Sequence, residues 1–183
     1  KFTMSHIGSF LSDRNPAILW EVLSELVSEN ENFASRFQLN LIGKVSQEII
    51  DSISKFNLSN YCNLVGYVSH NEAIVFQKKS QILLLIEINS PETRSIIPGK
   101  LFEYMVSERP IIAIGPKDSD FAEIITSTNT GVFFTYDEKD KLKKTIVSYF
   151  EMYLEKKLNV FPVGLQQYSR KKLTEQLAKL VHK

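Results

Sequence analysis

The chain has 183 residues, of which 43% are hydrophobic and 23% are charged, so it can bury the core of one globular domain. Its 22 Lys and Arg residues nearly balance its 21 Asp and Glu residues, which argues against a nucleic-acid-binding surface. The single cysteine excludes an internal disulfide and fits a reducing compartment, so we expect a cytoplasmic location.

Short apolar runs alternate with segments of helical periodicity along the whole chain. The predicted strands are residues 2–8, 39–45, 63–68, 81–88, 111–115 and 131–135. The predicted helices are residues 15–28, 46–56, 69–79, 100–107, 120–128, 139–156 and 169–183. This alternation predicts a three-layer α/β fold, with a doubly wound, mostly parallel six-stranded sheet of the Rossmann-like kind.

The predicted helix 100–107 connects two buried strands and is central to any ligand site. The residues expected to face the sheet are Leu101, Phe102, Met105 and Val106. The opposite face would carry Lys100, Glu103, Tyr104 and Ser107. The start of such a helix, at the carboxyl end of a parallel strand, is where α/β sheets bind anions. Glu103 would lie one turn further on, where it could accept hydrogen bonds from ligand hydroxyls.

Several known nucleotide and catalytic motifs do not fit this sequence. The first predicted strand ends at a lone Gly8 rather than at G-x-G-x-x-G, and Pro98-Gly99-Lys100 is followed by Leu101 where a P-loop needs Ser or Thr. No G-x-S-x-G nucleophile motif occurs. We interpret Asp118-Ser119-Asp120 as a helix start capped by Asp120, and the scattered histidines and lone cysteine predict no metal site.

Four stretches in order resemble the C-terminal half of a GT-B glycosyltransferase of the group 1 family. They are HIGSFLSDRNP (6–16), LVGYVSHNEA (64–73), IIPGKLFEYM with PIIAIGP (96–105 and 110–116), and TGVFFT (130–135). The closing YSRKKLTEQLAKLV (168–181), with an apolar side of Leu173, Leu177, Leu180 and Val181, resembles the terminal helix of these enzymes. The resemblance implies a nucleotide-sugar-binding domain at 1–165 and a helix at 166–183 that crosses to an N-terminal domain. We therefore expect the sequence to be part of a longer protein.

The resemblance also implies a role for each candidate site residue. Glu103 would accept hydrogen bonds from the ribose hydroxyls. The loop resembling the diphosphate contact contains Gly8, Ser9 and Arg14, and the segment resembling the base contact contains Tyr67 and Val68. The distal phosphate and sugar would be held by Ser95, Ile96, Ile97, Pro98, Gly99 and Lys100.

One position departs from the family pattern of two glutamates separated by seven residues. Ser95 stands where the first glutamate is expected, and Glu92 lies three residues earlier. The contact to the donor sugar and the stereochemistry of transfer therefore stay open.

The resemblance predicts an enzyme that transfers a sugar from a UDP- or GDP-sugar to an acceptor such as a growing cell-surface glycan. We expect binding by this domain, turnover only with the N-terminal acceptor domain, and no cofactor. Contact with the inner face of a membrane would come only through that other domain. Two alternatives are a sugar-nucleotide epimerase of the same architecture and a non-catalytic nucleotide-binding or interaction domain.

Overall fold

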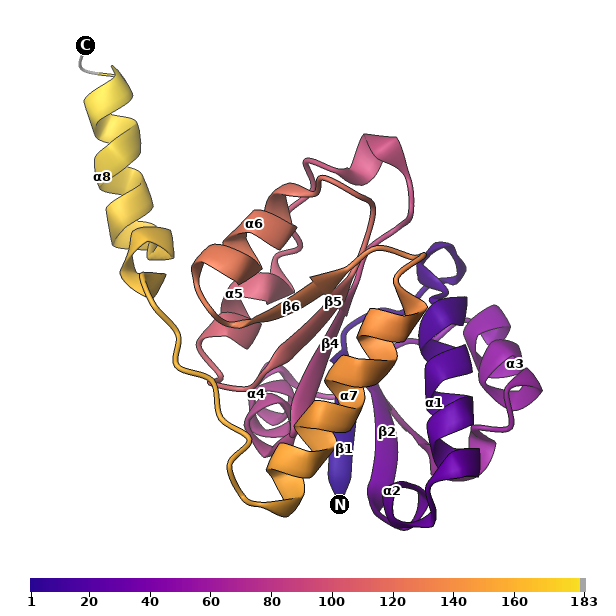
Figure 1. The fold of residues 1–183 in the computed structure, drawn as a ribbon. Coiled ribbons are helices and arrows are strands. Elements are labelled where there is room, and N and C mark those ends of the chain that lie inside the picture. The colour runs from indigo at the N-terminus through magenta and orange to yellow at the C-terminus, as the bar shows by residue number, and fades with distance from the viewer. Residues whose placement is uncertain (182–183) are drawn as a thin grey trace.

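The computed structural model describes residues 1–181, which form one six-stranded sheet covered by helices on both faces (Figure 1). The strands are β1 (Phe2–Ile7), β2 (Phe37–Ile42), β3 (Cys62–Gly66), β4 (Ile82–Ile86), β5 (Ile111–Ile114) and β6 (Gly131–Phe134). All neighbouring strands are parallel, in the order β3-β2-β1-β4-β5-β6. The predicted doubly wound α/β fold is therefore confirmed. The order reverses between β1 and β4, and such a reversal is the usual ligand position in open α/β sheets.

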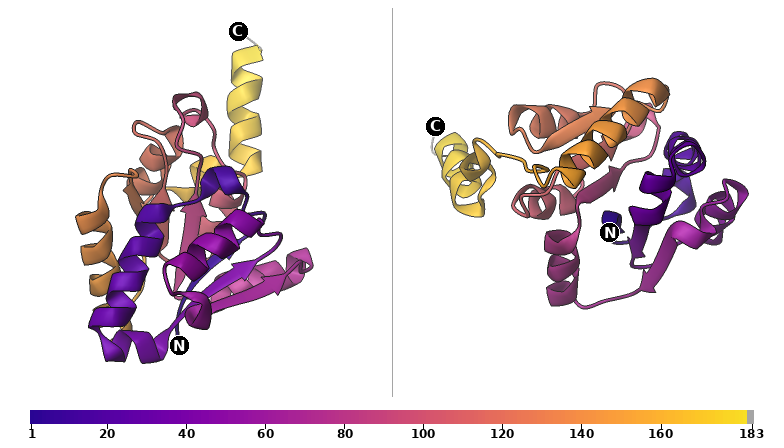
Figure 2. Two further views of the ribbon diagram at one scale, coloured as in Figure 1. Left: turned by 90° about the vertical axis from the view of Figure 1, so that its right-hand side faces the viewer. Right: turned by 60° about the horizontal axis from the view of Figure 1, so that its bottom comes forward.

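Two groups of helices form the outer layers of the domain (Figure 2). One face of the sheet is covered by α1 (Ala17–Glu29), α2 (Glu31–Arg36), α3 (Gln47–Lys55) and α7 (Lys139–Leu154). The other face is covered by α4 (His70–Lys79), α5 (Lys100–Met105) and α6 (Asp120–Ser127). The short 3-10 turns are η1 (Ser12–Arg14), η2 (Ser59–Tyr61), η3 (Pro91–Thr93) and η4 (Leu165–Tyr168).

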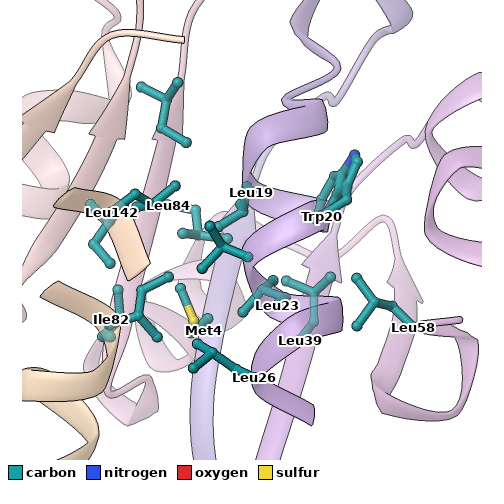
Figure 3. Packing of buried hydrophobic residues seen from close by; sticks show 14 of the residues in the cluster. Met4, Leu19, Trp20, Leu23, Leu26, Leu39, Leu58, Ile82, Leu84 and Leu142 are labelled. Carbon is teal, nitrogen blue, oxygen red and sulfur yellow. The ribbon is translucent and has the colours of Figure 1, made fainter. Parts of the chain in front are cut away.

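The larger core lies between the sheet and the α1–α7 layer. Figure 3 shows Met4 of β1 among Leu23 of α1, Leu84 of β4 and Leu142 of α7. These side chains are completely buried, and each fully buried aliphatic side chain contributes about 1.5–3 kcal/mol to folding. The core thus fixes the strands whose carboxyl ends build the site.

The structure corrects two local predictions. Residues 31–36 form the short helix α2, which was not expected, and the side chain of Asn30 caps it by accepting a hydrogen bond from the Phe33 amide at 3.0 Å. In α5 the buried residues are Leu101, Tyr104 and Met105, whereas Val106 is 66% exposed. Leu101 and Met105 are therefore buried as predicted, whereas Tyr104 and Val106 were assigned to the wrong faces, Val106 because the helix ends at Met105.

The hydroxyl of Tyr104 explains why this polar side chain faces the sheet. It accepts a hydrogen bond from the backbone amide of Ile7 at 2.9 Å, at the end of β1, and lies 3.3 Å from the Ile7 carbonyl. A buried phenol needs such a partner. This contact fixes α5 against the end of β1 and so positions the first residue of α5, Lys100.

Helix α8 (Arg170–Val181) extends away from the body of the domain (Figure 1). Two leucines of its predicted apolar side, Leu173 and Leu177, are exposed. The predicted end at Lys183 and the side chains of Leu180 and Val181 lie outside the described residues. Within residues 1–181, every helix is too short or too polar to cross a lipid bilayer.

Candidate functional site

Three glycines mark the carboxyl ends of β1, β2 and β3. Gly8, Gly43 and Gly66 have φ values of +113°, +118° and +80°, a region that favours glycine. The amide of Gly8 donates to the Ile42 carbonyl at 2.8 Å, and the amide of Gly43 donates to the Gly66 carbonyl at 2.7 Å. A Cβ on Gly43 would lie 2.5 Å from the Gly8 carbonyl oxygen. The three strand ends therefore pack backbone against backbone.

A small pocket of about 170 Å³ lies over these strand ends. The lining residues are Ile7, Gly8, Ser9, Ile42, Gly43, Lys44, Tyr67, Val68 and Ala73. Tyr67 is 92% exposed. The structure thus brings four predicted residues from two distant segments, Gly8, Ser9, Tyr67 and Val68, to one largely apolar pocket.

A second group of predicted residues lies at the reversal between β1 and β4. The Nε atom of Arg14 donates to Glu87 Oε1 at 3.2 Å, and a second guanidinium nitrogen lies 3.1 Å from the same oxygen. Glu87 is only 2% exposed, and its Oε1 also accepts a hydrogen bond from the Ile88 amide at 2.8 Å. The Tyr136 hydroxyl donates to the Glu87 carbonyl at 2.8 Å. Arg14 is therefore an oriented cation and not a freely solvated one.

Lys100 brings a second positive charge to the same point. Its Nζ atom lies 2.9 Å from Nε2 of His6 and packs close to Gly8, at van der Waals distance (3.5 Å) from the position that a Cβ would take there. Burial, and then the positive charge of Arg14, lower the pKa of Lys100 to about 8, while Glu87 opposes the shift. Lys100 is thus mostly protonated at pH 7. Two cations face one carboxylate here, which leaves an excess positive charge for an anionic ligand.

Glu103 lies on the exposed side of α5 and is held by a neighbouring helix. Its Oε2 accepts a hydrogen bond at 3.0 Å from Nε2 of Gln77, a residue of α4 that is only 3% exposed. This contact leaves the other carboxylate oxygen, Oε1, open to a ligand hydroxyl. Glu103 is therefore oriented without being buried.

The loop before α5 contains the remaining predicted residues. Ser95, Ile96, Ile97 and Gly99 are exposed, and Pro98 is half-buried. Helix α5, which follows this loop, has only six residues.

The structure adds four residues that sequence reasoning did not select, namely His6, Gly43, Glu87 and Tyr136. Glu87 could have been selected from the sequence, because it is a charged residue directly after the apolar run of β4. The sequences Ile42-Gly43 and Val65-Gly66 repeat the pattern of Ile7-Gly8 at three successive strand ends. His6 and Tyr136 are recognised only from their contacts.

The acidic segment Asp118-Ser119-Asp120 precedes α6. Ser119, and not Asp120 as predicted, occupies the N-cap position, and its hydroxyl donates to the Pro116 carbonyl. Within the described part of the chain, no three His, Cys, Asp or Glu side chains are grouped to hold a metal ion.

Several solved structures share the fold of this chain. HepE of Anabaena in complex with UDP and glucose superposes with a TM-score of 0.70 at 15% identity, over 100% of this chain and 48% of HepE. WaaG, a glycosyltransferase involved in lipopolysaccharide biosynthesis, gives a TM-score of 0.61 at 12% identity, over 81% of this chain and 38% of WaaG.

A third solved structure is itself a separate domain. The C-terminal domain of LpcC, a group 1 family glycosyl transferase of Francisella tularensis, gives a TM-score of 0.58 at 13% identity, over 82% of this chain and 76% of that domain. At these identities the likeness shows the fold alone. The chain spans less than half of HepE and WaaG, at 48% and 38% of their lengths.

Sequence comparison settles the family. A search of curated protein sequences gives no match. The sequence model of the family described as "Glycosyl transferases group 1" matches residues 1–151, which is most of the chain. The chain therefore belongs to the group 1 family of glycosyl transferases, and its fold is that of their C-terminal domain.

Proposed function

We propose that this chain is the donor-binding domain of an enzyme that transfers a sugar from a nucleotide-sugar to an acceptor such as a growing cell-surface glycan. The observation that carries the proposal is the convergence of Arg14 and Lys100 at the β1–β4 reversal, near a pocket lined by Gly8 and Tyr67. These features match the parts of a nucleotide-sugar: a flat base and an anionic diphosphate.

The two cations would act on the leaving group of the reaction. Negative charge develops on the diphosphate as the glycosidic bond breaks, and oriented cations stabilise that charge without reorganising. Attack also requires an acceptor held in the correct geometry, which we assign to an N-terminal domain. The family match is to glycosyl transferases and gives no support to an epimerase or a non-catalytic domain.

A panel of nucleoside diphosphates tests the proposal. Thermal unfolding would be measured with UDP, GDP, ADP and TDP, and UDP is the first choice because the HepE structures contain UDP or UDP-glucose. A ligand at 100 times its dissociation constant should stabilise the fold by about 2.7 kcal/mol. If none of the four at millimolar concentration raises the melting temperature, the donor-binding proposal fails.

We expect Glu103→Gln to weaken binding of the nucleotide with little change in stability. The substitution removes the charge that strengthens bonds from the ribose hydroxyls, and such bonds contribute about 1.5–3 kcal/mol, so affinity should fall by roughly one to two decades. Glu103 is exposed, so its side chain contributes little to the stability of the fold. Without ligand, the free energy of unfolding should therefore change by less than about 0.5 kcal/mol, and the melting temperature should barely change.

A calorimetric titration of both proteins with UDP and with its 2′,3′-dideoxyribose analogue checks the ribose contact. The loss should be large for UDP and small for the analogue, which lacks the hydroxyls. An equal loss for both ligands would show that Glu103 contributes charge but does not contact the ribose.

We assign residues 1–165 to the donor-binding domain and residues 166–183 to a crossing segment. The exposed Leu173 and Leu177 of α8 support this division, because they leave an apolar surface for an N-terminal domain to cover. The α8 amides should exchange hydrogen faster in this chain than in a protein that includes that domain. Equal exchange rates would contradict the assignment. We place the enzyme in the cytoplasm, in keeping with the single free Cys62.

A further inference from the structure

His6 is a buried polar residue for which the proposed site has no assigned role. It is the penultimate residue of β1 and its side chain is completely buried. Its ring stacks on Phe10, with 4.1 Å between ring centroids and an interplanar angle of 19°. Phe10 in turn belongs to the main core, so the imidazole has a fixed position.

The contact with Lys100 defines the protonation of this imidazole. The Lys100 ammonium can only donate, so Nε2 of His6, 2.9 Å away, must be the acceptor. The ring is then neutral with its proton on Nδ1, an atom that has no hydrogen-bond partner among the described residues. Burial, and then the charges of Lys100 and Arg14, hold the pKa of His6 well below its usual value, which agrees with a neutral ring.

The groups around this pair come from four elements. Arg14 lies in the loop after β1 and is paired with Glu87 at the end of β4. Tyr136 follows β6 and donates to the Glu87 carbonyl, and Tyr104 of α5 contacts the Ile7 backbone. Because Glu87 is paired with Arg14, the direct partner of Lys100 is a neutral imidazole. A carboxylate in that place would neutralise the ammonium, whereas an imidazole orients it and leaves its charge in full.

We propose that His6 is a positioning residue for the diphosphate: its Nε2 lone pair holds the Lys100 ammonium at the β1–β4 reversal, with the remaining N–H donors free for phosphate. This inference rests on the proposed function of the same site. Preorganisation of this kind removes the cost of fixing a flexible lysine when the ligand binds. His6 acts through Lys100 and does not itself touch the ligand.

Nuclear magnetic resonance of the ligand-free protein tests the pair directly. The imidazole nitrogen shifts should show Nδ1 protonated and Nε2 unprotonated from pH 6 to pH 8. The Lys100 Cε shift should titrate near pH 8. A protonated Nε2 in this range would overturn the proposal, whatever the protein binds.

Two variants test the consequence for binding. His6→Phe keeps a ring against Phe10 but removes the acceptor, so Lys100 should titrate at lower pH than in wild type. UDP affinity at pH 7.5 should fall about three- to tenfold, the effect of one lost hydrogen bond. His6→Gln supplies a carbonyl acceptor and should recover part of both losses.

The outcomes separate this inference from the proposed function. A His6→Phe protein that folds, with an unchanged Lys100 titration and unchanged UDP affinity, would overturn the role of His6. A merely structural role would lower the melting temperature without moving the Lys100 titration. If His6→Phe does not fold, the role of His6 is tested by the imidazole tautomer of wild type and by the Lys100 titration and UDP affinity of His6→Gln. If wild type shows the expected tautomer and titration but binds no nucleotide, the proposed function fails and the His6–Lys100 pair stands.

Discussion

Replacement of Lys100 by methionine should weaken nucleoside diphosphate binding by roughly one to two decades, since a charge-assisted hydrogen bond contributes about 1.5–3 kcal/mol. Stability should not fall. The partly buried ammonium has a pKa of about 8, well below the value of 10.5 for a free lysine, so the fold disfavours its charged form. Methionine keeps the aliphatic stem and removes that cost, which offsets the loss of the hydrogen bond to the buried His6. At pH 7 the variant should melt at the same temperature as wild type or higher.

The sign of the pH dependence follows from the same shift. The unfolded chain binds the lysine proton more strongly than the folded chain does, so Lys100 lowers stability below pH 8. This penalty disappears as the pH rises from about 8 towards 10.5. Nucleotide affinity should move in the opposite direction and decline as the pH rises through 8, because the ligand needs the ammonium.

A matched control is available at the same edge of the sheet. Lys117 follows β5 and is exposed, so Lys117→Met makes the same change in net charge two strands along the sheet from β1. Titration calorimetry of both variants between pH 7 and pH 9 should show a large loss only for Lys100→Met, whose affinity should also lose its pH dependence near 8. Equal losses would mean that bulk charge, and not the oriented ammonium, attracts the ligand.

The fold could be predicted because β and α segments alternate with clear periodicity. The predicted strand 81–88 and the observed β4 at Ile82–Ile86 differ only at the ends. Helix α2 was not predicted because its six residues contain only one buried side chain, Phe33. Tyr104 of α5 was assigned to the wrong face because its hydroxyl binds a backbone amide of β1, a contact 97 residues away in sequence.

The site could be predicted only in part, for a related reason. Gly8, Arg14 and Lys100 stand out as residue types suited to phosphate at the ends of strands. Their partners do not, because Arg14 pairs with Glu87 across 73 residues and Lys100 contacts His6 across 94. Periodicity reports which face of an element is buried. It contains no information about which two side chains meet where separate strands end.

The three strand-end glycines lead to the largest expected effect on stability. Gly43→Ala places a Cβ 2.5 Å from the Gly8 carbonyl oxygen in a residue with a φ of +118°. The positive φ costs about 1–2 kcal/mol in a residue with a side chain, and forced overlap adds about 1–3 kcal/mol. Because the overlapping atom belongs to the backbone of a central strand end, it cannot move aside cheaply. We expect a total loss of about 3 kcal/mol, or roughly 6–12 °C in melting temperature.

Substitutions at two other glycines distinguish the cost of the positive φ from the cost of the Cβ overlap. Gly66 has a φ of +80° and open space around its Cβ position, so Gly66→Ala should cost only the backbone strain of about 1–2 kcal/mol. Gly99 has a φ of −56° and also has open space, so Gly99→Ala should change stability by less than about 0.5 kcal/mol. Chemical denaturation of the three variants should therefore show the largest loss of stability for Gly43→Ala, a smaller loss for Gly66→Ala and the smallest for Gly99→Ala. If Gly43→Ala and Gly66→Ala cost the same, the Gly8 carbonyl can move away from residue 43 without further loss of stability, and the overlap contributes nothing.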